Sequence, residues 1–189
     1  PNIPKKIFIV PYRNRETHRL FFIRYMQFVL EDIPKNEYEI YFSHQTDNRI
    51  FNRGAVKNIG FLAMKNKYPT AYKDITFIFH DVDIIPYDKN IFPYDTKKGE
   101  VQHYYGFTFA LGGIFSIKGI DFERINGFPT YWGWGLEDNC LQKRCIKHDC
   151  KINREHFYKL GNKNVLHISD TVTKKVSEST AYKLSKDTG

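Results

Sequence analysis

One stretch of the sequence decides the fold: Thr76-Phe77-Ile78-Phe79-His80-Asp81-Val82-Asp83-Ile84-Ile85-Pro86. Its apolar residues predict a buried strand that runs into Asp-x-Asp and stops at proline. Ligands of open α/β sheets bind outside the carboxyl ends of the strands, and two carboxylates there are costly unless a positive group pairs with them. A divalent cation that holds a diphosphate is a natural partner, because hard cations prefer oxygen ligands. Asp is also common in turns, so the motif alone leaves an ordinary turn as the alternative.

The segments before this stretch alternate between two patterns. Short apolar runs predict strands at 6–10 and 38–42, and apolar residues at helical spacing predict helices over 20–30 and 51–64. Strands that alternate with helices argue for an α/β fold with a parallel sheet.

The segments after Pro86 are less regular. Residues 88–100 predict a loop, 101–117 are aromatic and contain glycine, 137–148 predict a helix, and 163–169 contain a short strand. Residues 171–189 are polar, and we expect a peripheral tail there. A chain of 189 residues is therefore expected to form a single domain over 1–170, followed by this tail.

A second motif holds both tryptophans of the chain: Tyr131-Trp132-Gly133-Trp134-Gly135-Leu136-Glu137-Asp138-Asn139. Glycine lets another molecule approach the backbone closely, and an indole face suits a sugar ring. Glu137 and Asp138 stand at the positive N-terminal end of the predicted helix, which favours ionised carboxylates. The motif predicts an acceptor-sugar site with a general base. A buried aromatic turn before an acidic helix start is the alternative.

The composition is that of a folded globule, with 41% hydrophobic and 16% aromatic residues. The net charge of +8 can attract phosphate-bearing ligands, or it can reflect a lysine bias, since the lysines form no dense block. The chain has neither a dense basic stripe nor an identifiable nucleic-acid motif, so we expect no nucleic-acid partner. No run of about eighteen apolar residues predicts a membrane segment.

The three cysteines, Cys140, Cys145 and Cys150, follow one another at five-residue spacing. Each step turns a helix by about 140°, so the thiols share no single face, and a zinc site is disfavoured. We expect free thiols, as in a reducing compartment; one disulfide and one free thiol are the alternative.

Further short motifs follow one another along the chain. They are Pro11-Tyr12-Arg13-Asn14-Arg15-Glu16-Thr17-His18, Phe51-Asn52-Arg53, Asp81-Val82-Asp83, Gly112-Gly113, Asn126-Gly127-Phe128-Pro129 and Trp132-Gly133-Trp134-Gly135-Leu136-Glu137-Asp138. In this order they resemble the β-1,4-galactosyltransferases (family 7 glycosyltransferases), over most of residues 7–170. The resemblance implies a GT-A fold, with a mixed, mainly parallel sheet flanked by helices. It also implies an inverting enzyme that uses a UDP-sugar, Mn²⁺ or another divalent cation, and a glycan or glycoconjugate acceptor.

The resemblance also implies roles for individual residues. Phe51 would pack on uracil, and Arg53 would contact the nucleotide with its planar guanidinium group. Asp138 would be the catalytic base, with Glu137 beside the donor or acceptor. The donor site would comprise Pro11, Arg13, Arg15, Phe51, Arg53, Asp81, Val82, Gly112, Gly113 and Trp134, and the acceptor site Trp132, Trp134, Glu137 and Asp138. For Arg13 and Arg15, a solvated helix start is the alternative.

Asp83 and His167 would be the metal ligands. A lone histidine among apolar neighbours is more often structural, but His167 matches the family's late metal-binding histidine. Relatives have a methionine three residues before it or a histidine two before it, where this chain has Asn164 and Val165. Asn164 could supply a carbonyl oxygen and Val165 has no ligating side chain, so the metal preference stays open.

The donor sugar depends on Ala110, two positions before the glycine pair. Family members usually have an aromatic residue there, which limits the space near C2 of the sugar. The smaller Ala110 would admit an N-acetyl group, so UDP-GalNAc and UDP-GlcNAc are alternatives to the first choice, UDP-Gal. Tyr104, Tyr105, Phe107 and Trp132 would shape the acceptor groove unless they are core residues. The alternative function is a non-catalytic carbohydrate-binding relative.

The expected cellular location depends on the kind of organism from which the protein comes. Free thiols and the lack of an anchor in this sequence favour a cytosolic viral or bacterial enzyme. A eukaryotic enzyme whose anchor has been removed would belong to the Golgi lumen.

Overall fold

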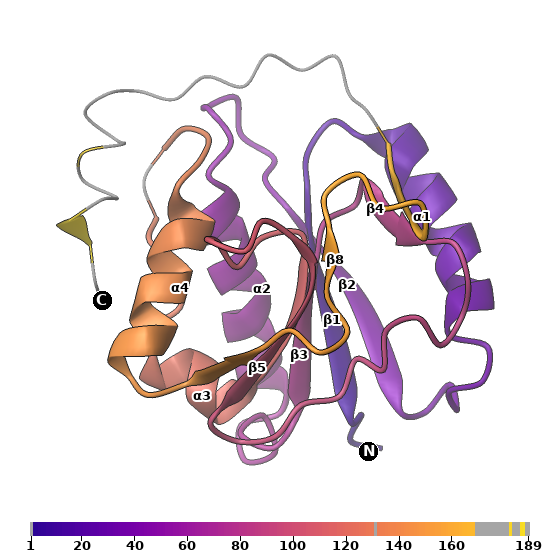
Figure 1. Cartoon of the computed structure of the whole chain (residues 1–189), viewed down its shortest axis with the longest axis horizontal. Helices are drawn as coiled ribbons and strands as arrows, with labels where there is room; N and C mark the ends of the chain where they lie inside the picture. Colours follow the sequence, from indigo (N-terminus) through magenta and orange to yellow (C-terminus); the bar gives the residue numbers. More distant parts are fainter. Residues whose placement is uncertain (1, 131, 169–181, 183–185, 188–189) are drawn as a thin grey trace.

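The structure is a computed structural model that describes residues 2–130, 132–168, 182, 186 and 187 (Figure 1). Its strands are β1 (Lys6–Tyr12), β2 (Tyr38–His44), β3 (Thr76–His80), β4 (Ile84–Pro86), β5 (Glu100–Gly106), β6 (Ile114–Lys118), β7 (Lys151–Asn153), β8 (Tyr158–Lys159) and β9 (Val165–His167). Its helices are α1 (Glu16–Val29), α2 (Arg53–Lys67), α3 (Gly119–Arg124) and α4 (Glu137–Lys147).

The main sheet has the strand order β2-β1-β3-β6-β5-β7, and β8 pairs with β5. β1 lies parallel to β2 and β3, and β7 and β8 lie parallel to β5. β6 runs antiparallel to both β3 and β5. The sheet is therefore mixed and mainly parallel, as the family resemblance predicted.

Helices cover both faces of this sheet (Figure 1). Adjacent strand residues project to opposite faces, so the fully buried Ile7 packs in a core cluster with side chains of α2, α3 and α4. Its equally buried neighbour Phe8 packs in a second cluster with side chains of α1. Burial of each such side chain stabilises the fold by about 1.5–3 kcal/mol. The two clusters explain why the central strands are apolar at consecutive positions.

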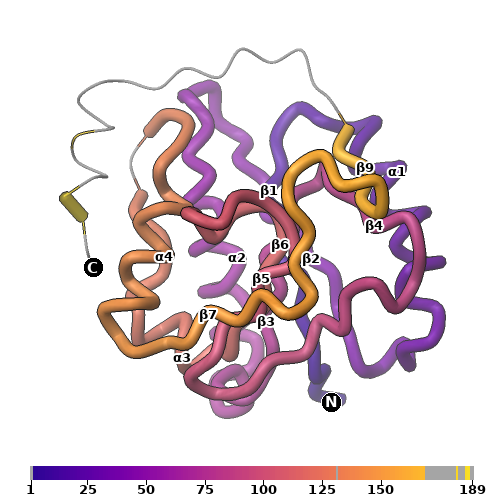
Figure 2. Tube along the Cα trace, viewed as in Figure 1, coloured from indigo at the N-terminus to yellow at the C-terminus, as the bar shows by residue number. Residues whose placement is uncertain are grey.

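A second, two-stranded sheet lies beside α1 (Figure 2). In it β4 pairs antiparallel with β9, and Ile84 stands opposite His167. The backbone N–H of Ile168 donates to the carbonyl oxygen of Asp83 at 2.7 Å and extends the pairing. This small sheet brings the end of the Asp81-Val82-Asp83 motif next to a segment more than 80 residues later in the sequence.

Most of the predicted elements are present. The second helix begins at Arg53 instead of residue 51, because the Asn52 side chain accepts a hydrogen bond from the Ala55 N–H at 2.9 Å and caps the helix. The aromatic segment predicted at 101–117 forms the antiparallel strands β5 and β6. Apart from Tyr182, Lys186 and Asp187, the tail predicted at 171–189 lies outside the described residues.

The three cysteines are buried free thiols, as expected. Cys140 and Cys145 belong to α4, and Cys150 follows its C-terminal end. Within the described part of the chain, none of the helices has the length and apolar character needed to cross a lipid bilayer.

Candidate active site

A pocket of about 920 Å³ opens at the carboxyl ends of β1 and β3. Its walls also come from the starts of α2 and α4, from the turn Gly112-Gly113 before β6 (the glycine turn), and from the end of β9. Of the predicted site residues, the lining includes Pro11, Arg13, Arg15, Phe51, Arg53, Asp81, Val82, Asp83, Gly112, Gly113, Trp134, Glu137, Asp138 and His167. Trp132 is the predicted site residue that does not line it.

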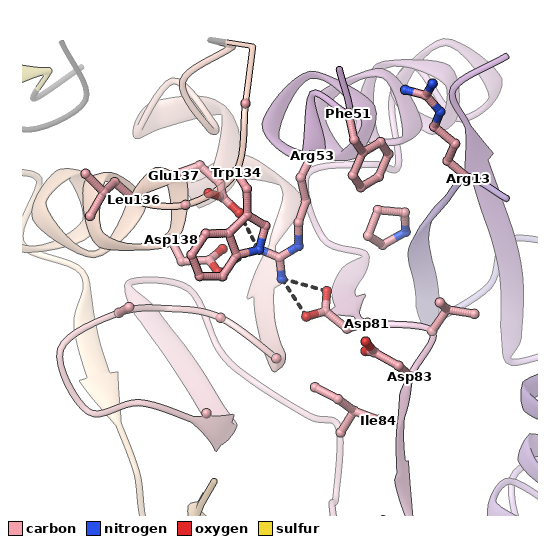
Figure 3. Close-up of a pocket in the computed structure, with 18 of the residues that line it drawn as sticks. Arg13, Phe51, Arg53, Asp81, Asp83, Ile84, Trp134, Leu136, Glu137 and Asp138 are labelled. Carbon is pink, nitrogen blue, oxygen red and sulfur yellow. Dashed lines mark hydrogen bonds and ion pairs between the residues drawn. The ribbon is translucent and has the colours of Figure 1, made fainter. Parts of the chain in front are cut away.

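Arg53 lies at the centre of the pocket, between two groups of carboxylates (Figure 3). One of its terminal nitrogens donates to both oxygens of Asp81, at 2.7 and 2.6 Å. The other donates to Asp138 Oδ2 at 2.6 Å and to Glu137. A single guanidinium group therefore joins the carboxyl end of β3 to the first turn of α4.

These contacts determine the charge of Asp81. Burial opposes ionisation of its carboxyl group, but the nearby charges of Arg53 and Lys57 outweigh burial and hold its pKa below the ordinary value. The carboxylates of Glu137 and Asp138 surround the same guanidinium, whose pKa is raised well above its usual range against the opposing effect of burial. We conclude that Arg53 stays charged and that Asp81 is ionised at neutral pH.

Asp83 has a different environment from Asp81. Burial raises the pKa of its carboxyl group, and the neighbouring Asp81 charge raises it further. Arg15 opposes both effects with a nitrogen 3.0 Å from Asp83 Oδ2. His167 Nε2 lies 4.0 Å from the same oxygen, a position that the pairing of β4 with β9 determines. Asp83 is thus a partly buried carboxylate that still favours a further positive partner.

The donor set at Asp83 and His167 fits a divalent cation. Carboxylate oxygen and imidazole nitrogen bind such ions at about 2.1 Å, so two donor atoms 4.0 Å apart can share one ion. Among the described residues, no group of three or more His, Cys, Asp or Glu side chains could hold a metal by itself. Two protein ligands would leave the other coordination positions to substrate oxygens and water, as expected for an ion that holds a phosphate.

The structure offers no further ligand at the two positions where the sequence departs from the family. Val165 is buried in the core cluster of α1. The backbone carbonyl oxygen of Asn164 accepts a hydrogen bond from the Tyr87 N–H at 3.0 Å. Neither residue lines the pocket.

Asp138 occupies the first turn of α4, after an unusual backbone conformation. Leu136 precedes the helix in the left-handed region, with φ 68°, a conformation that a non-glycine residue adopts at an energetic cost. Gly112 approaches so closely that a Cβ atom there would lie 2.6 Å from Asp138 Oδ2. The Asp138 carbonyl oxygen accepts from the Leu111 N–H at 3.0 Å. The glycine turn and the start of α4 therefore form one unit around the carboxylate.

The buried side chain of His103 is hydrogen-bonded to the backbone of this turn. Arg154 Nε lies 3.1 Å from His103 Nδ1, which must accept, so the proton of the neutral ring is on Nε2. That nitrogen donates to the carbonyl oxygens of Tyr105 and Gly112, at 3.1 and 3.0 Å. Burial and the Arg154 charge lower the pKa of His103 to about 4.

His80, directly before Asp81, is a second buried histidine, and it allows a test of how burial of a neutral histidine changes stability with pH. Burial lowers the pKa of His80, like that of His103, to about 4. The unfolded chain protonates these residues near pH 6.5 and the folded chain only near pH 4, so stability is lost as the pH falls across this interval. Each contributes about 3 kcal/mol to the change in the free energy of unfolding. Urea denaturation between pH 7 and 4 should show a smaller decrease in the free energy of unfolding for His80→Leu than for the wild type.

The exposed His156 supplies the matched control for this experiment. His156→Leu should keep the wild-type pH dependence of unfolding. An equal slope for His80→Leu and His156→Leu would contradict the assignment of His80 as a buried neutral residue.

The two tryptophans have different surroundings. Trp134 lines the pocket and its side chain is about half-exposed. Trp132 lies outside the lining, where the Arg49 guanidinium sits 4.1 Å from the centre of its ring, a cation–π contact. The loop that contains Arg49 and Phe51 is thereby connected to the tryptophan segment.

The aromatic residues expected in an acceptor groove separate into two groups. Tyr105 and Phe107 line the pocket, and Phe107 stacks with the exposed Phe109 at a ring distance of 5.0 Å. Tyr104 is a core residue: it is fully buried against Phe92, with 5.2 Å between ring centres. For Tyr104 the alternative of a core residue is therefore correct, because its ring packs in the core cluster that contains side chains of α1.

Sequence reasoning missed Lys57, whose side chain is 1% exposed. Its Nζ lies 3.3 Å from Asp138 Oδ1 and 4.0 Å from Asp81 Oδ1. The spacing contained a signal: Lys57 follows Arg53 by four residues on a predicted helix, which puts two cations on one face.

The chain is similar to known glycosyltransferases in sequence. Residues 3–95 match the family model described as the N-terminal region of glycosyl transferase group 7, and residues 96–168 match the one described as the N-terminal domain of galactosyltransferase. Beta-1,4-galactosyltransferase 4 of Rattus norvegicus is 34% identical over 156 residues, which are 77% of this chain and 44% of the relative. Beta-1,4-galactosyltransferase 1 of Homo sapiens is 33% identical over 162 residues, 80% of this chain and 39% of the relative. The chain thus spans less than half the length of these relatives.

Solved structures share the fold. The catalytic domain of Drosophila beta1,4galactosyltransferase 7, in complex with xylobiose, matches with a TM-score of 0.81 and 24% identity, over 98% of this chain and 81% of that one. A mutant of the Drosophila enzyme in complex with manganese, UDP-Gal and xylobiose matches with a TM-score of 0.76 and 23% identity, over 95% of this chain and 79% of that one. The architecture is the GT-A fold, as the sequence motifs predicted.

Proposed function

Because the chain belongs to the group 7 glycosyltransferase family, we propose that it is a metal-dependent, inverting glycosyltransferase. It would move a hexose, galactose first, from a UDP-sugar to a hydroxyl group of a glycan. One observation carries the proposal: Asp83 and His167, the proposed metal ligands, line the same pocket as Asp138, a carboxylate at a helix start. A single displacement needs a base on one side of the sugar and a neutralised leaving group on the other.

The donor would bind at the side of the pocket formed by β1, α2 and the Asp81-Val82-Asp83 motif. Phe51 offers a ring at the pocket wall for the uracil, and Arg15 offers a cation within reach of the diphosphate. Asp83 and His167 would hold the cation, which when bound neutralises the charge that develops on the diphosphate. A manganese ion and UDP-Gal accompany the Drosophila relative in its complex, which favours the same pair of ligands here.

The acceptor would bind next to α4. Trp134 presents an exposed indole face for a sugar ring, and Asp138 would take the proton of the attacking hydroxyl group as the new bond forms. Glu137, which accepts a hydrogen bond from Arg53, would lie beside the donor or acceptor. No second nucleophile is needed, because attack from the face opposite to UDP gives inversion in one step.

The choice of donor sugar rests on Ala110. It lines the pocket next to the glycine turn, and its methyl side chain occupies little space there. UDP-GalNAc and UDP-GlcNAc are therefore included beside UDP-Gal as donors to be tested.

The test is UDP release in the presence of Mn²⁺, with UDP-Gal, UDP-GalNAc, UDP-GlcNAc and UDP-Glc as donors and simple sugars as acceptors. We expect acceptor-stimulated release from UDP-Gal that is lost when the metal is chelated. If the folded protein binds UDP but releases it from none of these donors, it is better described as a carbohydrate-binding relative.

The metal site gives a separate prediction. Asp83→Asn and His167→Ala should each weaken Mn²⁺ binding by more than about 10–100-fold, the usual cost of losing an outer-shell partner, because each changes one of the two proposed direct ligands. Titration of Mn²⁺ followed by electron paramagnetic resonance measures this without turnover. His148→Ala, at the end of α4 and outside the pocket, is the control. Unchanged Mn²⁺ affinity in both pocket variants would refute the ligand assignment.

A further inference from the structure

Lys57 is a buried cation directly beside the proposed base. Its ammonium group has three N–H donors, and its nearest acceptor is Asp138 Oδ1 at 3.3 Å. Asp81 Oδ1 lies at 4.0 Å. Burial of an ammonium group is costly unless it is paired, so Lys57 remains where these two carboxylates hold it.

The two oxygens of Asp138 face different parts of the molecule. Oδ2 accepts from Arg53 at 2.6 Å and lies against Gly112, and both of those residues line the pocket. Oδ1 accepts from Lys57, which does not line the pocket. One oxygen therefore faces the substrates, and the other faces the protein interior.

The position of Lys57 is determined by the packing of α2. Its Nζ lies 4.6 Å from the centre of the Phe128 ring. The adjacent Asn58 side chain donates to the Phe128 carbonyl at 2.8 Å and accepts from the Phe128 N–H at 3.0 Å. One turn before Lys57, a Cβ atom on Gly54 would lie 2.0 Å from the Pro129 carbonyl oxygen, so no larger residue fits. α2 is thus held tightly against the segment under the ammonium group.

On the basis of the proposed function, we infer that Lys57 is a positioning residue for the base. It holds the inner oxygen of Asp138, so that the outer oxygen stays directed at the acceptor hydroxyl group. Arg53 lines the pocket, where bound donor can compete for its hydrogen bonds. Lys57 is out of reach of the substrates, and its hold on Asp138 therefore persists through the reaction.

Lys57→Met tests this role, because it keeps the length of the side chain and removes the charge. We expect kcat for transfer to fall about 10–100-fold, since a small misplacement of a reacting group can cost about 100-fold. The KM for the UDP-sugar and the affinity for UDP should change less than about threefold, because Lys57 does not reach the pocket. The matched control is Lys65→Met: Lys65 belongs to the same helix, also pairs with a carboxylate, and lies 5.1 Å from an aromatic ring.

A second experiment separates positioning from a structural role. In the Asp138→Asn background, Lys57→Met should lower the residual rate no further, because the lysine acts through Asp138. If Lys57 had only a structural role, Lys57→Met would lower the rate by the same factor in the wild type and in Asp138→Asn. If Lys57→Met does not fold, Lys57→Gln takes its place, with the same expected fall in kcat.

The outcomes distinguish this inference from the proposed function. Wild-type turnover is measured first, and an inactive wild type would contradict the proposed function itself. With an active wild type, an unchanged kcat in Lys57→Met, or an equal loss in both backgrounds, overturns the positioning role of Lys57.

Discussion

Asp138→Asn lowers the rate of sugar transfer by about 10²–10⁴-fold, the usual contribution of a general base. The amide has nearly the shape of the carboxylate but cannot accept the proton of the acceptor hydroxyl group. UDP binding should persist, because the side of the pocket proposed for the nucleotide is formed by β1, the start of α2 and the Asp81-Val82-Asp83 motif, apart from Asp138. Initial rates of UDP release with acceptor, together with calorimetry of UDP binding, measure the two effects separately.

The control for this variant is Glu155→Gln, which makes the same chemical change on an exposed carboxylate between β7 and β8. It should keep the wild-type rate. Asp138→Asn protein that turns over normally would exclude Asp138 as the base. Loss of both UDP binding and turnover would point instead to a damaged site.

Arg53→Met lowers the free energy of unfolding by about 3–5 kcal/mol, the usual cost of removing one partner from a buried charge network. The change removes the hydrogen bonds to Asp81, Glu137 and Asp138 and leaves Lys57 as the nearest buried cation. The mutual repulsion of the three carboxylates is then largely uncompensated. Urea denaturation at pH 7 measures the loss.

Two further variants show whether charge is the cause. Arg19→Met removes a partly exposed arginine that pairs with Glu16 on α1, and it should cost at most about 1 kcal/mol. Adding Asp81→Asn to Arg53→Met should recover part of the stability, because one of the unpaired charges is gone. A destabilisation of Arg53→Met no larger than that of Arg19→Met would show that the network contributes little.

The first half of the fold was predictable because its signals are local. The apolar runs and helical spacing before Asp81 identified β1, α1, β2, α2 and β3 in their correct order. The pairing of β4 with β9 was not predictable from spacing, since three-residue strands carry almost no periodicity. His167 was assigned through the family resemblance alone, and the small sheet is what brings it near Asp83.

The contacts of the charged side chains in the pocket were likewise predictable only in part. The family resemblance implied that Arg53 contacts the nucleotide, whereas in the structure its hydrogen bonds go to three carboxylates from two distant segments. Tyr104 and Trp132 were expected at a ligand groove, and neither lines the pocket. Whether an aromatic side chain faces the core or a ligand depends on the partner strand and helix, which one-dimensional spacing does not specify.

By itself, the sequence predicted the α/β fold class, because that follows from local periodicity, and its motifs pointed through the family resemblance to the residues proposed to carry the chemistry. Only the tertiary structure decided how the charges pair. It joined Asp81 to α4 through Arg53, brought His167 to Asp83, and buried Lys57 behind Asp138. Such pairs form between segments far apart in the chain, where distance and burial, which set the strength of each interaction, exist only after the chain has folded.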